Sequence, residues 1–213
     1  MKTKISIGRE QMVPDILNGN SLKQGVEIGV FKGQFSRLLL ERWPGKLWLV
    51  DPWRAFSDEE GYIDASNHKN HQTAYMETMN RLEGFESRAF MLRGLSSDMA
   101  SRFQDGELDF AYIDGNHAYD WVVEDIELWW PKIKSGGFLM GHDYLGLEDW
   151  HESPFLANGK DKDIWMRGPE IGDQLIYAGH FGVNTAVDEF VAREGLDLTI
   201  TAEWIGTWII KKP

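Results

Sequence analysis

The sequence predicts an α/β fold in which a mostly parallel sheet lies between two layers of helices. Short, nearly continuous apolar runs alternate with segments of helical spacing, which is typical of βαβ units. Because crossovers between parallel strands are right-handed, helices are expected on both faces of the sheet. The chain has 213 residues, of which 42% are hydrophobic, and this predicts a single domain over residues 1–213 with a substantial core.

Five apolar runs are predicted to form the parallel strands, at residues 25–29, 46–50, 88–92, 108–113 and 138–141. Apolar residues at helical spacing predict helices between them, at residues 33–41, 70–83, 99–103 and 119–130. A looser helical pattern covers the N-terminal segment, residues 1–20, and ends at Asn18-Gly19-Asn20.

The last third of the chain has a different character. Residues 145–182 show weak periodicity and several turn signals, such as Asn158-Gly159. A long segment of this kind inside a compact domain is usually functional or mobile, so we expect an insertion that forms a ligand pocket or a lid. A predicted helix follows at 183–193, and two predicted strands at 198–201 and 204–210 give an antiparallel pair.

Composition and charge exclude several classes of protein. The net charge of −12 argues against a nucleic-acid partner, because phosphate binding needs a basic surface. No apolar run approaches the roughly 18 residues of a membrane-spanning helix, and the first residues lack the apolar core of a secretory signal. The absence of cysteine excludes disulfides and thiolate chemistry. We therefore expect a cytoplasmic protein with a small-molecule partner, and the sequence does not indicate whether it forms a homo-oligomer.

A glycine-containing turn and a carboxylate follow the first two predicted strands. In the segment Glu27-Ile28-Gly29-Val30-Phe31-Lys32-Gly33, glycines allow a ligand to approach the backbone closely. Phe31 occupies the middle glycine position of the dinucleotide fingerprint, so a pyrophosphate would fit poorly. Asp51 ends the second strand, where a carboxylate can bind both hydroxyls of a ribose. Together the two features describe an adenosine-type site, whereas singly they are also consistent with a plain tight turn and a turn-stabilising carboxylate.

Two acidic residues and two histidines follow the fourth and fifth predicted strands. Asp114 and Asp143 are expected close together, because adjacent parallel strands end at the same edge of the sheet. Close carboxylates repel unless a cation or proton lies between them, and with one imidazole, from His142, they suit Mg²⁺ or Mn²⁺. His117 is a candidate general base. The alternatives are that Asp114 caps the next helix and that the histidines are structural.

These motifs resemble those of a known family. The runs VEIGVFKGQFS, LVDPW, RGLSSDMA and LDFAYIDGNHAYDWVVEDIELWWPKIKSGGFLMGHDY resemble class I S-adenosylmethionine-dependent methyltransferases, above all the small-molecule O-methyltransferases that include the macrocin-type sugar enzymes. The C-terminal run GVNTAVDEF and the strands after it are similar to the end of that fold. The resemblance covers roughly residues 24–144 and 180–211 and implies a three-layer, Rossmann-like sheet.

The resemblance also implies roles for individual residues. The methionine end of S-adenosyl-L-methionine would be bound by Glu27, Gly29 and Gly33. Asp51 would bind the ribose, and Ser96 and Ser97 would lie near the adenine.

A weaker resemblance to catechol O-methyltransferase concerns the catalytic centre. It implies that Asp114 and Asp143 are metal ligands and that His117 is the basic catalytic residue. Asp114 would in addition be a catalytic and cofactor-binding residue. Macrocin-type enzymes carry an Asp-Asp pair where this chain has His142-Asp143, so an imidazole would replace one carboxylate ligand.

The expected function is methylation of an oxygen on a small hydroxylated acceptor such as a sugar or a phenol, with Mg²⁺ or another divalent cation if the acidic cluster binds one. Two alternatives remain open. One is a non-catalytic module that binds S-adenosylmethionine or a nucleotide. The other is an NAD-linked oxidoreductase, which Phe31 and the C-terminal strand pair disfavour. The sequence does not identify the acceptor. Its pocket is expected from residues 145–182 and 53–71, which supply Trp53, Tyr62, Trp150, His151, Trp165 and Arg167.

Overall fold

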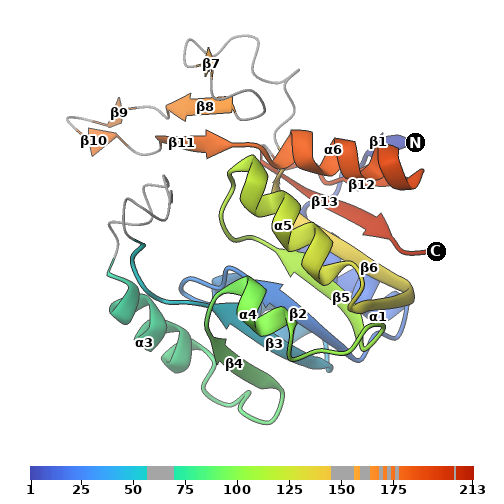
Figure 1. The fold of residues 1–213 in the computed structure, drawn as a ribbon. Helices are drawn as coiled ribbons and strands as arrows, with labels where there is room; N and C mark the ends of the chain where they lie inside the picture. Colours follow the sequence, from blue (N-terminus) through green and yellow to red (C-terminus); the bar gives the residue numbers. More distant parts are fainter. Residues whose placement is uncertain are drawn as a thin grey trace.

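The computed structural model centres on an eight-stranded sheet with the order β1-β12-β13-β6-β5-β2-β3-β4 (Figure 1). It describes residues 1–56, 70–144, 182–203 and 205–213, together with the backbone of five short strands between residues 156 and 181. The parallel strands are β2 (Gln24–Ile28), β3 (Lys46–Asp51), β4 (Ala89–Arg93), β5 (Leu108–Ile113) and β6 (Ile133–Tyr144). The antiparallel strands are β12 (Leu198–Ile200) and β13 (Gly206–Lys211), and β13 pairs with β6. The predicted fold class is confirmed.

Helices cover both faces of the sheet, as predicted (Figure 1). One face is covered by α1 (Arg9–Gly19), α2 (Gln34–Arg42) and α3 (His71–Arg81). The other face is covered by α4 (Ser96–Ala100), α5 (Tyr119–Trp129) and α6 (Val183–Glu194). Each face has its own hydrophobic cluster, represented by Leu17 and Leu39 on the first and by Ile126 and Val187 on the second.

The sequence explains why the central strands and the helix ends form where they do. All six residues of β5 are buried, because a parallel strand covered on both faces needs apolar side chains in both directions. The side chain of Asn70 caps α3 by accepting a hydrogen bond from the backbone N–H of Thr73 at 3.0 Å. Gly195 ends α6 in a left-handed conformation, with φ 66°.

The N-terminal segment differs from the prediction of a helix over residues 1–20. Its first residues form a strand, β1 (Lys2–Lys4), which pairs in parallel with β12, and α1 begins only at Arg9. The strand is short and fully exposed, so it leaves no apolar pattern in the sequence. Other boundaries also shift: α4 covers Ser96–Ala100 rather than residues 99–103, and β6 covers Ile133–Tyr144 rather than residues 138–141.

The predicted insertion at 145–182 contains short strands. A three-stranded antiparallel sheet has the order β11-β8-β7, formed by β11 (Ala178–Phe181), β8 (Ile164–Arg167) and β7 (Leu156–Asn158). A second pair joins β10 (Gln174–Leu175) to β9 (Glu170–Ile171). The expected acceptor residues Tyr62, Trp150 and His151, and the side chains of Trp165 and Arg167, lie outside the described part of the chain.

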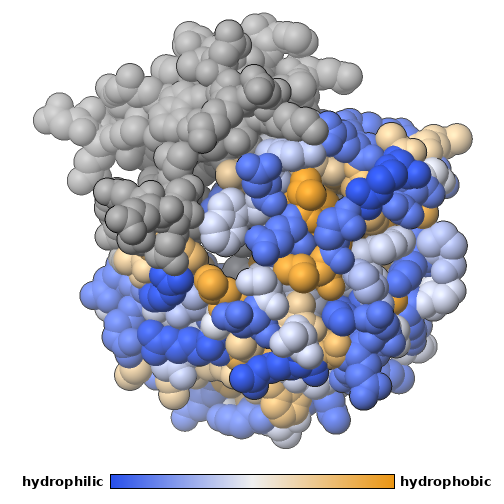
Figure 2. All heavy atoms as spheres, in the orientation of Figure 1, coloured by the Kyte–Doolittle hydropathy of each residue, from blue (hydrophilic) through white to orange (hydrophobic). Residues whose placement is uncertain are grey.

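On the face drawn in Figure 2, the described surface is mostly hydrophilic, with hydrophobic residues in small groups. Among the described residues, no helix is both long enough and apolar enough to cross a membrane.

Candidate active site

A cavity of about 380 Å³ opens at the carboxyl ends of the parallel strands. Each strand contributes a residue at or just beyond its end, namely Gly29, Asp51, Ser96, Asp114 and Asp143. Of the other sequence-predicted site residues, the cavity is also lined by Glu27, Ser97 and His117. Gly33 and His142 are not among the described lining residues, although both lie next to residues that are.

The turn after β2 has an unusual backbone. Gly29, Phe31 and Gly33 all have positive φ, of 86°, 51° and 71°. A Cβ at Gly29 would lie 2.0 Å from the carbonyl oxygen of Asp114, so only glycine fits this position. Phe31 adopts a conformation that costs about 1–2 kcal/mol for a residue with a side chain. Its carbonyl oxygen is held by Trp53 Nε1 at 2.8 Å and by Thr78 Oγ1 at 2.9 Å.

Trp53 was expected in the acceptor pocket, and this expectation is wrong. Its side chain is only 1% exposed and packs in the hydrophobic cluster beneath α2 and α3. The indole therefore stabilises the turn after β2 instead of meeting a ligand.

Asp51 organises the same turn from the end of β3. Its Oδ2 accepts hydrogen bonds from the backbone N–H groups of Val30 at 3.0 Å and Phe31 at 2.8 Å, and its Oδ1 accepts one from Trp53 at 2.6 Å. Burial raises the pKa of Asp51, while these N–H donors act in the opposite direction. The carboxylate thus stabilises the turn, and it also lines the cavity.

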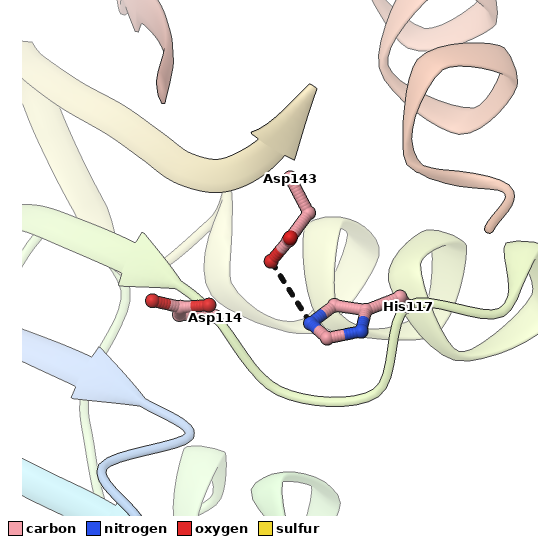
Figure 3. A group of neighbouring side chains, drawn as sticks. All are labelled: Asp114, His117 and Asp143. Atoms are coloured by element: carbon pink, nitrogen blue, oxygen red, sulfur yellow. Dashed lines mark ion pairs between the residues drawn. The ribbon is translucent and has the colours of Figure 1, made fainter. Parts of the chain in front are cut away.

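Asp114, His117 and Asp143 form a compact cluster at the ends of β5 and β6 (Figure 3). Their ligand atoms all lie within 4.8 Å of one another. His117 Nε2 lies 2.9 Å from Asp143 Oδ2, and His142 Nδ1 lies 3.2 Å from the same oxygen and 3.9 Å from Asp114 Oδ1. The structure therefore brings together the four residues that were predicted from the sequence to surround a metal or a base.

The two carboxyl groups of this cluster differ in their pKa. Burial raises the pKa of Asp114, and the charge of Asp143 adds to the effect. Burial also acts on Asp143, but the contacts with His117 and His142 outweigh it and hold the pKa of Asp143 well below its ordinary value. Asp143 is therefore the more acidic member of the pair and the natural partner of an imidazolium.

A family model described as "Methyltransferase domain" matches residues 26–144, which is more than half of the chain. The chain belongs to this methyltransferase family. No curated protein matches the sequence significantly.

Solved structures share the fold of this methyltransferase at low sequence identity. A putative caffeoyl-CoA O-methyltransferase from Staphylococcus aureus is 13% identical, with 96% of this chain and 82% of that chain covered and a TM-score of 0.62. An O-methyltransferase from Bacillus cereus, solved with S-adenosylhomocysteine, is 12% identical, with 97% and 81% covered and a TM-score of 0.62. A Streptomyces achromogenes O-methyltransferase of tomaymycin synthesis, solved with S-adenosylmethionine, is 12% identical, with 96% and 80% covered and a TM-score of 0.61. The predicted class I methyltransferase fold is confirmed.

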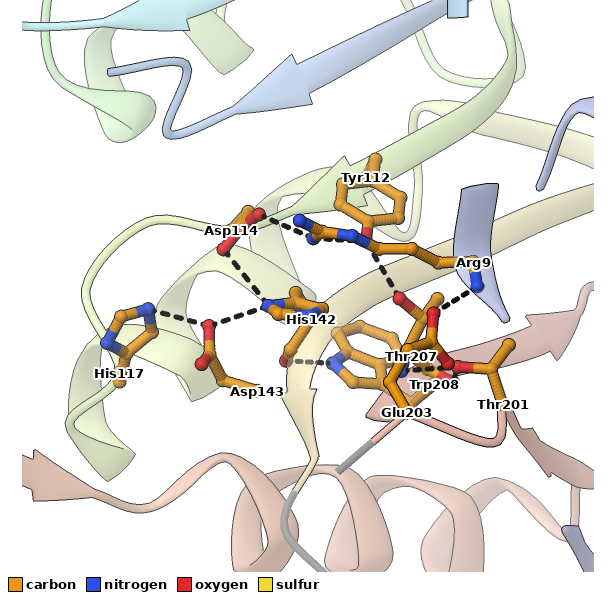
Figure 4. A network of polar contacts seen from close by, with 10 residues as sticks. All are labelled: Arg9, Tyr112, Asp114, His117, His142, Asp143, Thr201, Glu203, Thr207 and Trp208. Carbon is orange, nitrogen blue, oxygen red and sulfur yellow. Dashed lines mark hydrogen bonds and ion pairs between the residues drawn. The ribbon is translucent and has the colours of Figure 1, made fainter. Parts of the chain in front are cut away.

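Arg9 is a site residue of the methyltransferase that sequence reasoning missed. From the first turn of α1 it lines the cavity, with Nη1 3.4 Å from Asp114 Oδ2 and 3.4 Å from the hydroxyl of Tyr112 (Figure 4). The backbone N–H of Arg9 donates to the carboxylate of Glu203, which fixes the start of the helix. No motif marks Arg9, because its partners lie about half the chain and nearly the whole chain away.

Two buried carboxyl groups, Glu27 and Asp125, also line the cavity. Burial raises the pKa of Glu27 to about 8 and that of Asp125 to about 7. Asp125 lies near Ser96, whose hydroxyl oxygen accepts a hydrogen bond from Trp129 Nε1 at 2.8 Å. Asp125 was also missed, although an acidic residue on the apolar side of the helix pattern VVEDIELW is a signal that could have found it.

Proposed function

We propose that this methyltransferase uses S-adenosylmethionine to methylate an oxygen of a small hydroxylated acceptor. The observation that carries the proposal is the contact of 2.9 Å between His117 and Asp143 in the same cavity that the turn after β2 and Asp51 line. The residues we assign to the base and to the adenosine therefore line one pocket. The Bacillus cereus and Streptomyces achromogenes structures, solved with S-adenosylhomocysteine and S-adenosylmethionine, support this choice of cofactor.

The cofactor would extend along the strand ends. We assign its methionine end to Glu27, Gly29 and Gly33, with Asp114 alongside, because these residues surround the turn after β2. The ribose is assigned to Asp51. The adenine is assigned to Ser96 and Ser97, at the N-terminus of α4.

The Asp143–His117 pair supplies the proton chemistry. When Nε2 donates its hydrogen to Asp143, the proton-accepting ring nitrogen is Nδ1, which is buried in this structure and which the acceptor hydroxyl would have to reach on binding. Bound S-adenosylmethionine would supply the methyl group, and its sulfur would leave with the electron pair of the C–S bond as the acceptor oxygen bonds to the methyl carbon. His117 would take the hydroxyl proton of the acceptor. The carboxylate of Asp143 stabilises the imidazolium that forms, as a general-base dyad requires.

The same cluster fits a divalent cation. Two carboxylates and an imidazole are suitable ligands for Mg²⁺ or Mn²⁺. We assign the imidazole ligand to His142, because its Nδ1 faces both Asp143 and Asp114, and this leaves His117 to act as the base. A bound cation would lower the pKa of the acceptor hydroxyl. If the assignment is right, EDTA abolishes turnover and added Mg²⁺ restores it. Turnover that is insensitive to EDTA would remove the cation from the proposal.

The direct test of the proposed function has two steps. Calorimetry with S-adenosylhomocysteine should show saturable binding that NADH does not compete away. Transfer of labelled methyl from S-adenosylmethionine is then measured on a panel of sugars, phenols and hydroxy acids, with thiol and amine analogues as controls. Binding without transfer to any hydroxylated acceptor would favour the non-catalytic module, and preferential binding of NADH would contradict the cofactor assignment.

A further inference from the structure

Arg9 is placed at the cavity by contacts that reach across the whole chain. β1 pairs with β12 at the edge of the sheet, and the carboxylate of Glu203 accepts the backbone N–H of Arg9. The guanidinium then extends over the ring of Phe35, with its carbon 4.8 Å from the ring centroid, toward Asp114 (Figure 4). The side chain is 26% exposed, so it borders the cavity without being sealed off from it.

The guanidinium retains hydrogen-bonding capacity in this position. Its contacts with Asp114 and Tyr112 both use Nη1, and both distances are 3.4 Å, longer than the usual range for an N–H donor. An arginine side chain carries five N–H donors in a planar fork. Among the described residues, Nε and Nη2 of Arg9 have no acceptor, so one edge of the fork is available to a ligand.

Arg9 is a positively charged residue surrounded by acidic side chains at this end of the cavity. The surrounding acidic side chains are those of Glu27, Asp114 and Asp143, and the only other lysine or arginine among the described lining residues is Arg54. Arg54 lies over the ring of Phe56, 4.4 Å from its centroid. A partly buried cation next to acidic groups suits a ligand that carries a positive and a negative group side by side.

The methionine end of the cofactor is such a ligand, because it carries an ammonium and a carboxylate on one carbon. We propose that Arg9 binds the α-carboxylate of S-adenosylmethionine through the free edge of its guanidinium, while Glu27 and Asp114 face the ammonium. A planar fork matches a carboxylate with two parallel hydrogen bonds. The inference rests on the proposed function, since it presupposes that this cofactor binds in this cavity.

The test compares two ligands that differ only in the carboxylate. Calorimetry gives the dissociation constants of S-adenosylhomocysteine and of its decarboxylated analogue, in the original protein and in Arg9→Met. We expect the original protein to bind the analogue at least about tenfold more weakly, because a charge-assisted contact is lost. In Arg9→Met this ratio should fall to about one, through weaker binding of S-adenosylhomocysteine and with the affinity for the analogue little changed.

Two further variants complete the test. Arg54→Met removes the other lining arginine and should leave the ratio as in the original protein. Arg9→Lys keeps the charge but not the fork, so it should give an intermediate ratio, and it serves if Arg9→Met does not fold. The affinity for the decarboxylated analogue shows in each variant that the pocket is intact.

Each contrary result has a distinct meaning. An equal loss of affinity for both ligands in Arg9→Met overturns the inference and leaves Arg9 as a partner of Asp114. A ratio that Arg9→Met does not change also overturns it, and it leaves a carboxylate of the acceptor as the remaining candidate ligand. Failure of the original protein to bind S-adenosylhomocysteine overturns the proposed function itself, and this inference with it.

Discussion

The turn after β2 and the charged cluster after β5 line the same cavity but are stabilised in different ways. The turn is held by hydrogen bonds to its backbone: Asp51 accepts from Val30 and Phe31, and Phe31 accepts from Trp53 and Thr78. The cluster is held by contacts between side chains of three separate segments: Arg9, the loop from Asp114 to His117, and the pair His142-Asp143. A site fixed through its backbone suits a constant ligand such as a cofactor, whereas titratable side chains in contact with one another suit the movement of protons.

The largest effect is expected from a change in the cluster. His117→Ala should lower kcat by roughly 10²–10⁴-fold, because it removes the base. The affinity for S-adenosylhomocysteine should stay within about twofold, since the turn after β2 is untouched. Added imidazole should restore part of the activity. Turnover that stays near the original level would instead give His117 a structural role, visible as a lower Tm.

The next effect concerns the backbone of the turn. Gly29→Ala places a Cβ 2.0 Å from the carbonyl oxygen of Asp114 at φ 86°, and we expect a loss of about 3 kcal/mol or more in the free energy of unfolding. Gly84→Ala is the matched control, because it has φ 90° with nothing within 4 Å of the new Cβ. It should cost only about 1–2 kcal/mol. Equal losses in chemical denaturation would show that the close approach to Asp114 is unimportant.

A third prediction concerns the pH dependence of stability, which Glu27, in the strand before the turn, is expected to influence. Burial raises the pKa of Glu27 from 4.5 to about 8, so the folded state holds a proton that the unfolded state has lost. The contribution of Glu27 to stability is fully present below about pH 4.5 and is lost as the pH rises toward 8.

Glu27→Gln tests this dependence, because glutamine does not titrate. The free energy of unfolding of the ligand-free protein, measured between pH 5 and 8, should fall less steeply in Glu27→Gln than in the original protein. The remaining slope is expected to come partly from Asp125, whose pKa is also raised, to about 7. Identical slopes in both proteins would contradict the assignment of a raised pKa to Glu27.

The smallest effect is expected at Asp51. Asp51→Asn keeps the shape but turns one acceptor oxygen into a donor facing a backbone N–H, so the affinity for S-adenosylhomocysteine should weaken by about 1–3 kcal/mol. Calorimetry measures this change, and Asp98→Asn, at an exposed position of α4, is the control. An unchanged affinity would limit Asp51 to its contacts within the protein.

The contrast between the two regions also explains what could be predicted from the sequence. Gly29 and Asp51 were identifiable because the turn, its glycines and the end of the next strand lie within 23 residues of chain. The proximity of Asp114 and Asp143 followed from the parallel order of β5 and β6. Both predictions needed only local patterns and the rule that parallel strands end at one edge.

Long-range contacts between polar groups were beyond such reasoning. Arg9 reaches Asp114 across 105 positions and Glu203 across 194, and neither pair shows any periodicity or motif. β1 was missed for a similar reason, since three exposed residues pair with a strand near the other end of the sequence. The second role of Asp51, as a stabiliser of the turn, was foreseen only as an alternative, because spacing cannot tell a ligand contact from a backbone contact.

The pairing of β1 with β12 has a consequence for solubility as well as for binding. β1 is the edge strand of the sheet, and it is short, with Lys2 and Lys4 exposed. Short, lysine-bearing edges discourage one sheet from adding to another, which is a common route to aggregation. Removing residues 2–4 would uncover the backbone groups of β12 and at the same time release the segment that holds Arg9. We therefore expect removal of residues 2–4 to lower both the colloidal stability of the protein and its affinity for S-adenosylhomocysteine.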